Sequence, residues 1–262
     1  MKKLKIEIDI LIFVLIEALS LMFFFKTSLL NLVIGTIFGI ILIFITNKIK
    51  INKLIKIILL LASILLFLTI INKITSFISF NILRNYPSFI ITFTFILSAL
   101  YLAKRGFHTY TKALEISAYF FLFLKLATFI LIIPNINISN FNIQLIKETT
   151  LDINIFYIAL SFLLLNLSIK YLTNKKIHIT SYLISSINPL LIKLLTILVM
   201  GETLLSLYDY PYVNIFKRIK YFDFIERMEG ILSFEYLFSF FFLASFFIIV
   251  IYSIIKDILI KD

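Results

Sequence analysis

Long runs of apolar residues follow one another along almost the whole chain, separated by short basic or Asn-rich stretches. The runs are roughly 18 to 25 residues long, which is the length that a helix needs to cross the hydrocarbon core of a bilayer. In a run such as 57-IILLLASILLFLTII-71 polar and apolar positions do not alternate, so the pattern favours helices over the strands of a membrane barrel. It predicts eight spans, at about residues 9–25, 28–47, 55–72, 87–103, 113–133, 153–172, 181–205 and 231–255.

The composition supports the same interpretation. Of the 262 residues, 61% are hydrophobic and 15% are charged, whereas soluble globular domains carry about 25% charged residues. The mean hydropathy is +1.08. No segment between the predicted spans is long enough for a soluble domain, so residues 1–262 are predicted to form a single transmembrane domain. The predicted fold class is therefore an all-α polytopic membrane protein embedded in the lipid bilayer.

The distribution of Lys and Arg predicts the orientation. With eight spans both ends of the chain lie on one side of the membrane, and the loops on that side hold most of the basic residues, as in 1-MKKLK-5 and 48-KIKINKLIK-56. Because basic loops stay in the cytoplasm, the sequence predicts an N-in, C-in topology in the cell membrane. Such loops facing anionic headgroups also explain the net charge of +11, so no nucleic-acid partner is expected.

Several kinds of catalytic or metal chemistry are not supported by the residues. The chain has no cysteine, and its two histidines, His108 and His178, fall in separate predicted loops. No cluster with metal-ligand spacing, no phosphate-binding glycine loop and no nucleophile elbow is present in the sequence. We therefore expect neither a metal nor a cofactor, and we do not expect an enzyme.

Among the charged residues within the predicted spans, four are singled out as candidates: Glu17, Lys125, Lys193 and Glu202. A charge at such a position costs roughly 2.5–3.5 kcal/mol on insertion scales, so it usually faces a partner, a cavity or the interface. Lys193 and Glu202 lie about 13 Å apart on opposite faces of one straight helix, so they would not neutralise each other. Glu17 and Lys125 lie on other spans, and either glutamate could pair with either lysine. Structural pairing and direct contact with a substrate or ion are both compatible with this pattern.

Two further features predict how the helices pack. Gly35 and Gly39 have the GxxxG spacing that lets a second helix approach closely. Asn188-Pro189 falls inside the seventh span, where proline removes a backbone hydrogen bond and can kink the helix. A broken helix is also how many transporters expose backbone groups to a substrate.

Charged residues become frequent again between the seventh and eighth spans. Tyr210-Pro211 is expected to end the preceding helix, and apolar residues then recur every three or four positions from Ile215 to Ile225, with charged residues between them. This spacing predicts an amphipathic helix at about residues 214–229, lying in the outer interface.

Two stretches of the chain resemble one known family. The stretch 199-VMGETLLSLYDYPYVNIFKRIKYFDFIERMEGILSFEYLF-238 resembles the most recognisable segment of the spore germination permeases, the B subunits of endospore nutrient-germinant receptors. The stretch 101-YLAKRGFHTYTKALEI-116 resembles a basic cytoplasmic loop of that family, and the next span ends in 131-LIIPNINISN-140, similar to the family's Pro-Asn ending. The clear resemblance covers residues 98–250. The positions that match the family's Gly-x-Glu, Tyr-Pro and Phe-x-x-Arg-x-Glu elements are Gly201, Glu202, Tyr210, Pro211, Phe224, Arg227 and Glu229.

The resemblance implies a fold and a function. It implies a bundle similar to the amino-acid/polyamine/organocation transporters, in a subunit that senses or transports a small nutrient such as an amino acid during spore germination. The implied location is the inner membrane of the spore, and the implied partners are A-type and C-type receptor subunits. The family normally has ten spans, so this chain would be a shortened member. Its first span, 10-ILIFVLIEALSLMFF-24, also lacks the glycines that would unwind a substrate-binding helix.

The candidate residues fall into two groups. A ligand pocket is expected from polar groups on the first, sixth and seventh spans together with the lysine of the fifth. Ser161 and Asn166 fit equally well as hydrogen-bonding residues between packed helices. The ligand-binding candidates are Glu17, Lys125, Ser161, Asn166 and Glu202. A structural or partner surface is expected from Gly201, Tyr210, Pro211, Phe224, Arg227 and Glu229, of which the last two would hold the outer helix against its neighbour or a partner subunit.

Two other functions fit the sequence. A scaffold subunit that binds no ligand and only carries partners is favoured by the missing glycines and helices. An unrelated small transporter, or a transmembrane coupling component of an ATP-driven uptake system, would use the basic cytoplasmic loops to bind ATPase subunits. A paired Ala-Arg-Gly coupling signature would indicate this last function, and the chain has one Lys-Arg-Gly, at residues 104–106.

Overall fold

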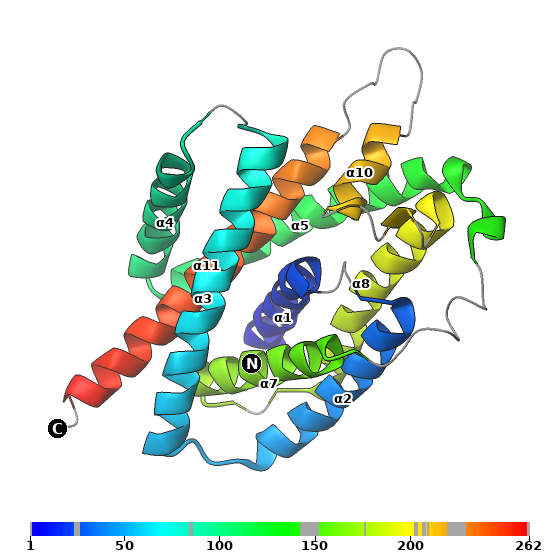
Figure 1. The fold of residues 1–262 in the computed structure, drawn as a ribbon. Coiled ribbons are helices and arrows are strands. Elements are labelled where there is room, and N and C mark those ends of the chain that lie inside the picture. The colour runs from blue at the N-terminus through cyan, green and yellow to red at the C-terminus, as the bar shows by residue number, and fades with distance from the viewer. Residues whose placement is uncertain are drawn as a thin grey trace.

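A computed structural model describes residues 2–23, 27–83, 86–141, 152–175, 177–201, 204–205, 208, 210–218 and 229–260 (Figure 1). These residues form helices and contain no strand. The long helices are α1 (Lys2–Phe23), α2 (Leu29–Lys48), α3 (Lys53–Asn81), α4 (Ser88–Lys104), α5 (Phe107–Ile132), α7 (Asn154–Thr173), α8 (Ile179–Met200) and α11 (Glu229–Ile260). The short elements are η1 (Ile133–Asn135), η2 (Ile138–Asn140) and α10 (Pro211–Arg218).

The helices are those of a polytopic membrane protein. Among the described residues, six helices are long and apolar enough to cross a bilayer, namely α2, α3, α5, α7, α8 and α11. Helix α4 is shorter, at 17 residues, and α1 carries the acidic residues Glu7, Asp9 and Glu17. A helix occurs at each of the eight predicted spans, which confirms the all-helical architecture. Eight membrane crossings and the N-in, C-in orientation stay predictions.

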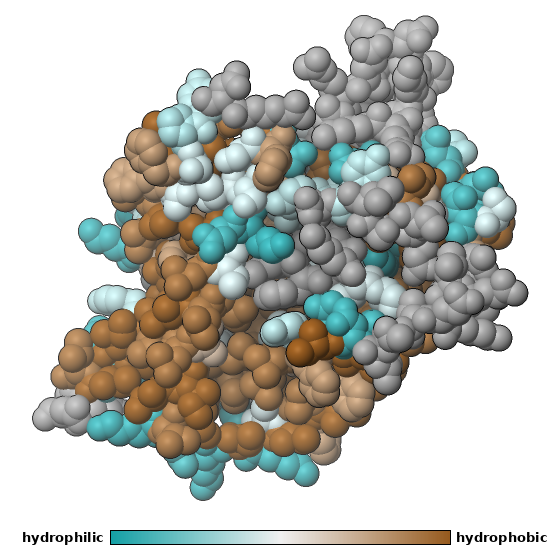
Figure 2. All heavy atoms as spheres, viewed as in Figure 1, coloured by the Kyte–Doolittle hydropathy of each residue, from teal (hydrophilic) through white to brown (hydrophobic). Residues whose placement is uncertain are grey.

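Large apolar side chains face outwards on several helices. Leu65 on α3, Phe89 on α4 and Phe123 on α5 are each more than 60% exposed. Figure 2 shows a broad, continuous apolar surface on the face shown there. Soluble monomers seldom expose contiguous apolar patches larger than a few hundred Å², so lipid tails are the natural cover for this surface.

Helix α1 lies at the centre of the bundle. Its residues Leu11, Ile12, Leu15 and Ile16 are at most 1% exposed, and it packs against α5, α7, α8 and α11. In Figure 1 the surrounding helices enclose it. Because other helices surround α1, its buried acidic residues Glu7 and Glu17 meet protein groups instead of lipid. The helix is continuous, as expected from a first span without glycine.

Helix α3 is longer than the predicted span 55–72, because it continues to Asn81. Lys73 therefore lies inside the helix and not in the loop that was expected to follow residue 72. Apolar residues at helical spacing from Ile70 to Ile78 are buried, while the polar residues Thr69 and Ser76 are exposed on another face. Polar residues on one face of this half of α3 lowered the hydropathy, and the predicted span ended too early for that reason.

The boundaries near the opposite end of the chain also differ from the prediction. Helix α8 ends at Met200 instead of 205, and it passes through Pro189 without interruption. The expected amphipathic segment 214–229 begins earlier, at Pro211 of α10, which fits the preference for proline at the first helical position. Glu229 belongs to α11 as its first residue. Residues 219–228 lie outside the described part of the chain.

The GxxxG pair brings α2 and α7 into close contact, as predicted. A Cβ atom added to Gly35 would lie 2.9 Å from Ile158 Cβ, and one added to Gly39 would lie 2.8 Å from Phe162 Cγ. Distances this short are repulsive, so only glycine allows the two backbones to approach so closely.

We expect Gly39→Ala to destabilise the folded protein by about 1–2 kcal/mol, because the added methyl group must displace the buried Phe162 ring. The measurement is the free energy of unfolding in mixed detergent micelles. Gly230→Ala is the matched control, since no atom lies within 4 Å of a Cβ added at this helical position. Equal stabilities of the two variants would contradict the close packing of α2 on α7.

Candidate functional site

Three charged side chains from three helices meet inside the bundle. Lys125 of α5 forms an ion pair with Glu17 of α1, and its Nζ lies 3.4 Å from Oε1 of Glu235 on α11. The structure thus brings Glu17 and Lys125 together, which is one of the pairings left open by the sequence. We call these three residues the Glu17–Lys125–Glu235 cluster.

The cluster is removed from solvent. Glu17 and Lys125 are each 4% exposed, and Glu235 is 2% exposed. Burying charges costs several kcal/mol per ion even when they are paired, so burial of all three needs a strong mutual interaction. The cluster holds one ammonium group and two carboxyl groups, so only one full ion pair can form within it.

Helix periodicity places these charges towards the interior. Lys125 follows the buried Phe121 by four positions and precedes the buried Thr128 by three, so it belongs to the inner face of α5. Glu17 needs no special face, because α1 is buried all round. On α11, Glu235 and its neighbour Tyr236 are both buried.

Aromatic and hydroxyl groups complete the surroundings. The Lys125 ammonium lies 5.2 Å from the centroid of the Phe13 ring, within reach of a cation–π interaction. Tyr212 of α10 is 4% exposed. Burial raises the pKa of Tyr212 well above its ordinary value, and the charges of Glu235 and Glu17 raise it further, against a smaller lowering by Thr128. The Tyr212 hydroxyl therefore stays protonated and keeps a proton to donate.

Ser161 and Asn166, the candidates from the sixth span, make hydrogen bonds elsewhere. The Ser161 hydroxyl donates to the Ile158 carbonyl of its own helix, at 2.7 Å. Asn166 is fully buried and donates from Nδ2 to Oγ1 of Thr46 on α2, at 2.6 Å, while Tyr182 donates to Asn166 Oδ1 at 3.4 Å. The two hydrogen bonds of Asn166 connect α7 to α2 and α8.

The remaining candidates are placed as follows. Gly201 ends α8 with a φ of 78°, a conformation that favours glycine, and the Asn140 amide donates to the carbonyls of Leu198 and Val199 just before it. The Tyr210 ring packs edge-on against Phe77, at 5.0 Å between centroids. Pro211 and Glu229 begin α10 and α11. Glu202, Phe224 and Arg227 lie outside the described residues.

Glu235 is the residue that sequence reasoning missed. It lies inside the predicted span 231–255, so the rule that singled out the other intramembrane charges applies to it equally. Tyr212 carries no comparable signal, because a tyrosine in an amphipathic segment is ordinary and its position beside the carboxylates depends on how α10 packs.

Comparison with known proteins identifies no relative. No protein-family model matches the chain, and no curated protein or solved structure matches it. The resemblance to spore germination permeases is therefore carried by the quoted residues alone.

Proposed function

We propose that this protein is a membrane subunit of a nutrient-germinant receptor, which binds a small zwitterionic nutrient such as an amino acid and senses or transports it during spore germination. The Glu17–Lys125–Glu235 cluster is the observation that carries the proposal. It places two carboxylates and one ammonium in the interior of a helical bundle, and ionisable residues at such depth usually serve a substrate or ion pathway.

The charges of the cluster complement those of a zwitterion. An incoming ammonium group can pair with Glu235, the carboxylate farther from Lys125, while an incoming carboxylate can pair with Lys125 and accept a hydrogen bond from Tyr212. Glu235 then has a cation of its own, while Glu17 and the incoming carboxylate share Lys125. Because a zwitterion carries no net charge, this exchange leaves the total charge of the buried site unchanged.

Helix α10 links the cluster to the proposed partner surface. Its residues Tyr212, Val213 and Ile215 are buried, and it packs on α8 and α11. Pro211 of the predicted partner surface begins α10, and Tyr210 directly precedes it. Occupation of the cluster would therefore be communicated to A-type and C-type subunits through a shift of α10.

One observation favours a second function, that of a ligand-free scaffold. All three charged groups are buried and already in contact with one another, an arrangement that would also serve to fix α1, α5 and α11 in register.

Amino-acid binding by the variant Glu235→Gln distinguishes the two functions. This variant keeps the Glu17–Lys125 pair, so it should fold. We expect the purified protein in neutral-lipid nanodiscs to be stabilised by one or more members of an amino-acid panel, seen as a rise in Tm. The affinity should fall about tenfold or more in Glu235→Gln, because the ammonium group loses its charged partner.

Lys56→Met is the matched control, since it breaks a partly exposed ion pair of 2.8 Å with Asp257 and leaves the cluster intact. This variant should bind as the wild type does. If no amino acid or sugar stabilises the folded wild type, or if Glu235→Gln binds unchanged, the scaffold function is supported instead.

A further inference from the structure

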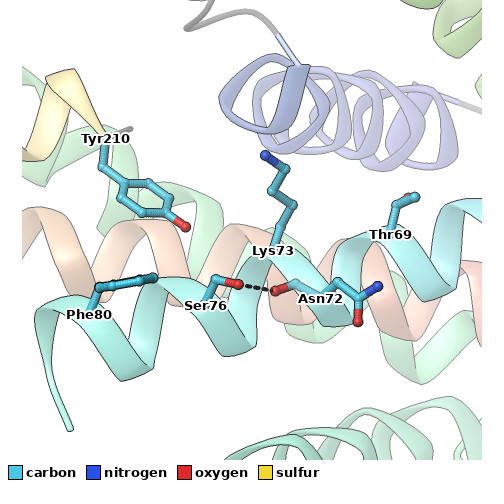
Figure 3. A pocket seen from close by; sticks show the side chains of 6 residues that line it. All are labelled: Thr69, Asn72, Lys73, Ser76, Phe80 and Tyr210. Atoms are coloured by element: carbon cyan, nitrogen blue, oxygen red, sulfur yellow. Dashed lines mark hydrogen bonds between the residues drawn. The ribbon is translucent and has the colours of Figure 1, made fainter. Parts of the chain in front are cut away.

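A polar cavity lies beside the second half of α3, and the proposed function does not use it. Its volume is about 330 Å³, at the lower end of the range for small-molecule sites. It is lined by Thr69, Asn72, Lys73, Ser76, Phe80 and Tyr210 (Figure 3). All but the last belong to α3.

The lining forms a continuous polar stripe on a helix that crosses the membrane. Thr69, Asn72, Lys73 and Ser76 are spaced by three or four positions, so they share one face. Figure 2 shows hydrophilic side chains over this half of α3, beside the apolar surface over the other half. Polar groups facing lipid would be costly, whereas the same groups facing a water-filled hollow are not.

The chemistry of the described lining is that of an anion site. It offers one ammonium group, the Lys73 side chain, which extends away from α3 in Figure 3. The Asn72 amide and the Tyr210 hydroxyl carry hydrogen-bond donors, whereas the Thr69 and Ser76 hydroxyls donate to the carbonyls of Leu66 and Asn72 in α3 itself. Among the residues that the structure describes there, none is a carboxylate. Phe80, which is 68% exposed, and the Tyr210 ring add an apolar end to the cavity.

The aromatic end of the cavity is held in place by rings of α3 and α11. Tyr210 packs on Phe77 at 5.0 Å and on Tyr236 at 5.8 Å, and Tyr236 follows Glu235 directly in α11. Phe77 and Tyr236 are themselves 4.2 Å apart. These three rings form one aromatic contact that joins α3, α11 and the residue that precedes α10.

We infer that this cavity is a separate binding site for a small solute that carries a carboxylate or phosphate group, with Lys73 as its charged partner and the Phe80 and Tyr210 rings against its apolar part. The inference goes beyond the proposed function, because it uses no residue of the Glu17–Lys125–Glu235 cluster.

Phenylacetate and its uncharged analogue phenylacetamide are the probes for a soluble ligand. Binding is measured by calorimetry on the full chain in phosphatidylcholine nanodiscs. We expect phenylacetate to bind and phenylacetamide not to bind. Lys73→Gln should weaken phenylacetate binding about tenfold or more, because a charge-assisted interaction is lost. Lys53→Gln, at the other end of the same helix, should have no effect.

The phosphate group could also belong to a lipid headgroup, and a second experiment tests this alternative. Retention of phosphatidylglycerol on the purified protein is measured by native mass spectrometry, in the wild type and in Lys73→Gln. Lys73-dependent binding of phenylacetate assigns the site to soluble solutes, and Lys73-dependent retention of phosphatidylglycerol assigns it to lipid. If Lys73→Gln equals the wild type in both arms, the anion site is wrong.

The variant Glu235→Gln distinguishes the site on α3 from the site of the proposed function. Phenylacetate binding should survive in Glu235→Gln, whereas binding of an amino acid at the cluster should not. Loss of phenylacetate binding in Glu235→Gln would mean that there is a single site, and it would overturn the inference.

Discussion

Replacing Lys125 by methionine should lower the free energy of unfolding by about 3–5 kcal/mol, because it leaves two buried carboxylates facing each other without a cation. Methionine keeps the apolar stem and removes the ammonium group with its cation–π contact to the Phe13 ring, so the loss reports mainly on charge. The measurement is unfolding in mixed detergent micelles followed by circular dichroism.

Neutralising the carboxylates should reverse most of this loss. In the triple variant Glu17→Gln, Lys125→Met and Glu235→Gln, no charge remains in the cluster, and we expect stability close to that of the wild type. Lys56→Met is again the control, and its partly exposed pair with Asp257 should contribute no more than about 1 kcal/mol. If Lys125→Met lowers the free energy of unfolding no more than this control does, the ionic interactions of the cluster do not stabilise the fold as expected.

The sequence predicted the helices well, because hydropathy responds to the membrane and each helix satisfies its own backbone hydrogen bonds. It also predicted the close contact at Gly35 and Gly39, although it did not say that the partner is α7. The predicted end of α3 was wrong. Polar residues such as Asn72 and Lys73 lower the mean hydropathy of this half of the helix to that of a loop, although the apolar residues on its other face are buried.

The candidate site was predictable in part. A charge inside a span signals that a partner exists, so Glu17 and Lys125 were found. The helices that carry Lys125 and Lys193, α5 and α8, both contact α1, so the choice between the two lysines depends on which side chain faces Glu17. The roles of Glu202, Phe224 and Arg227 stay predictions, because these residues lie outside the described part of the chain.

The hydrogen bonds from α7 to α2 show that polar residues within the predicted spans also hold helices together. Asn166 binds Thr46 near the end of α2, and one turn later the Lys170 ammonium donates to the carbonyls of Thr46, Asn47 and Ile49, at 3.0, 3.0 and 2.6 Å. The last carbonyls of a helix have no partner within the helix. Lys170 therefore caps α2 from a neighbouring helix, and its charge opposes the negative end of the helix dipole.

We expect Lys170→Met to lower the free energy of unfolding by about 2–3 kcal/mol, because the carbonyls at the end of α2 lose a charged donor. Amide exchange near residues 46–50 should rise in the variant, since that helix end opens more often. Lys170→Arg should recover part of the stability, because the guanidinium group donates to several acceptors at once.

Lys175→Met is the control for the loss of a basic side chain at the same end of α7. Lys175 is exposed, so its replacement should change stability by no more than about 0.5 kcal/mol and leave amide exchange in α2 unchanged. Equal effects of Lys170→Met and Lys175→Met would show that water or lipid headgroups satisfy the carbonyls of α2 just as well. A selective effect of Lys170→Met would place this lysine among the residues that hold the bundle together, distinct from the buried cluster proposed to bind a nutrient.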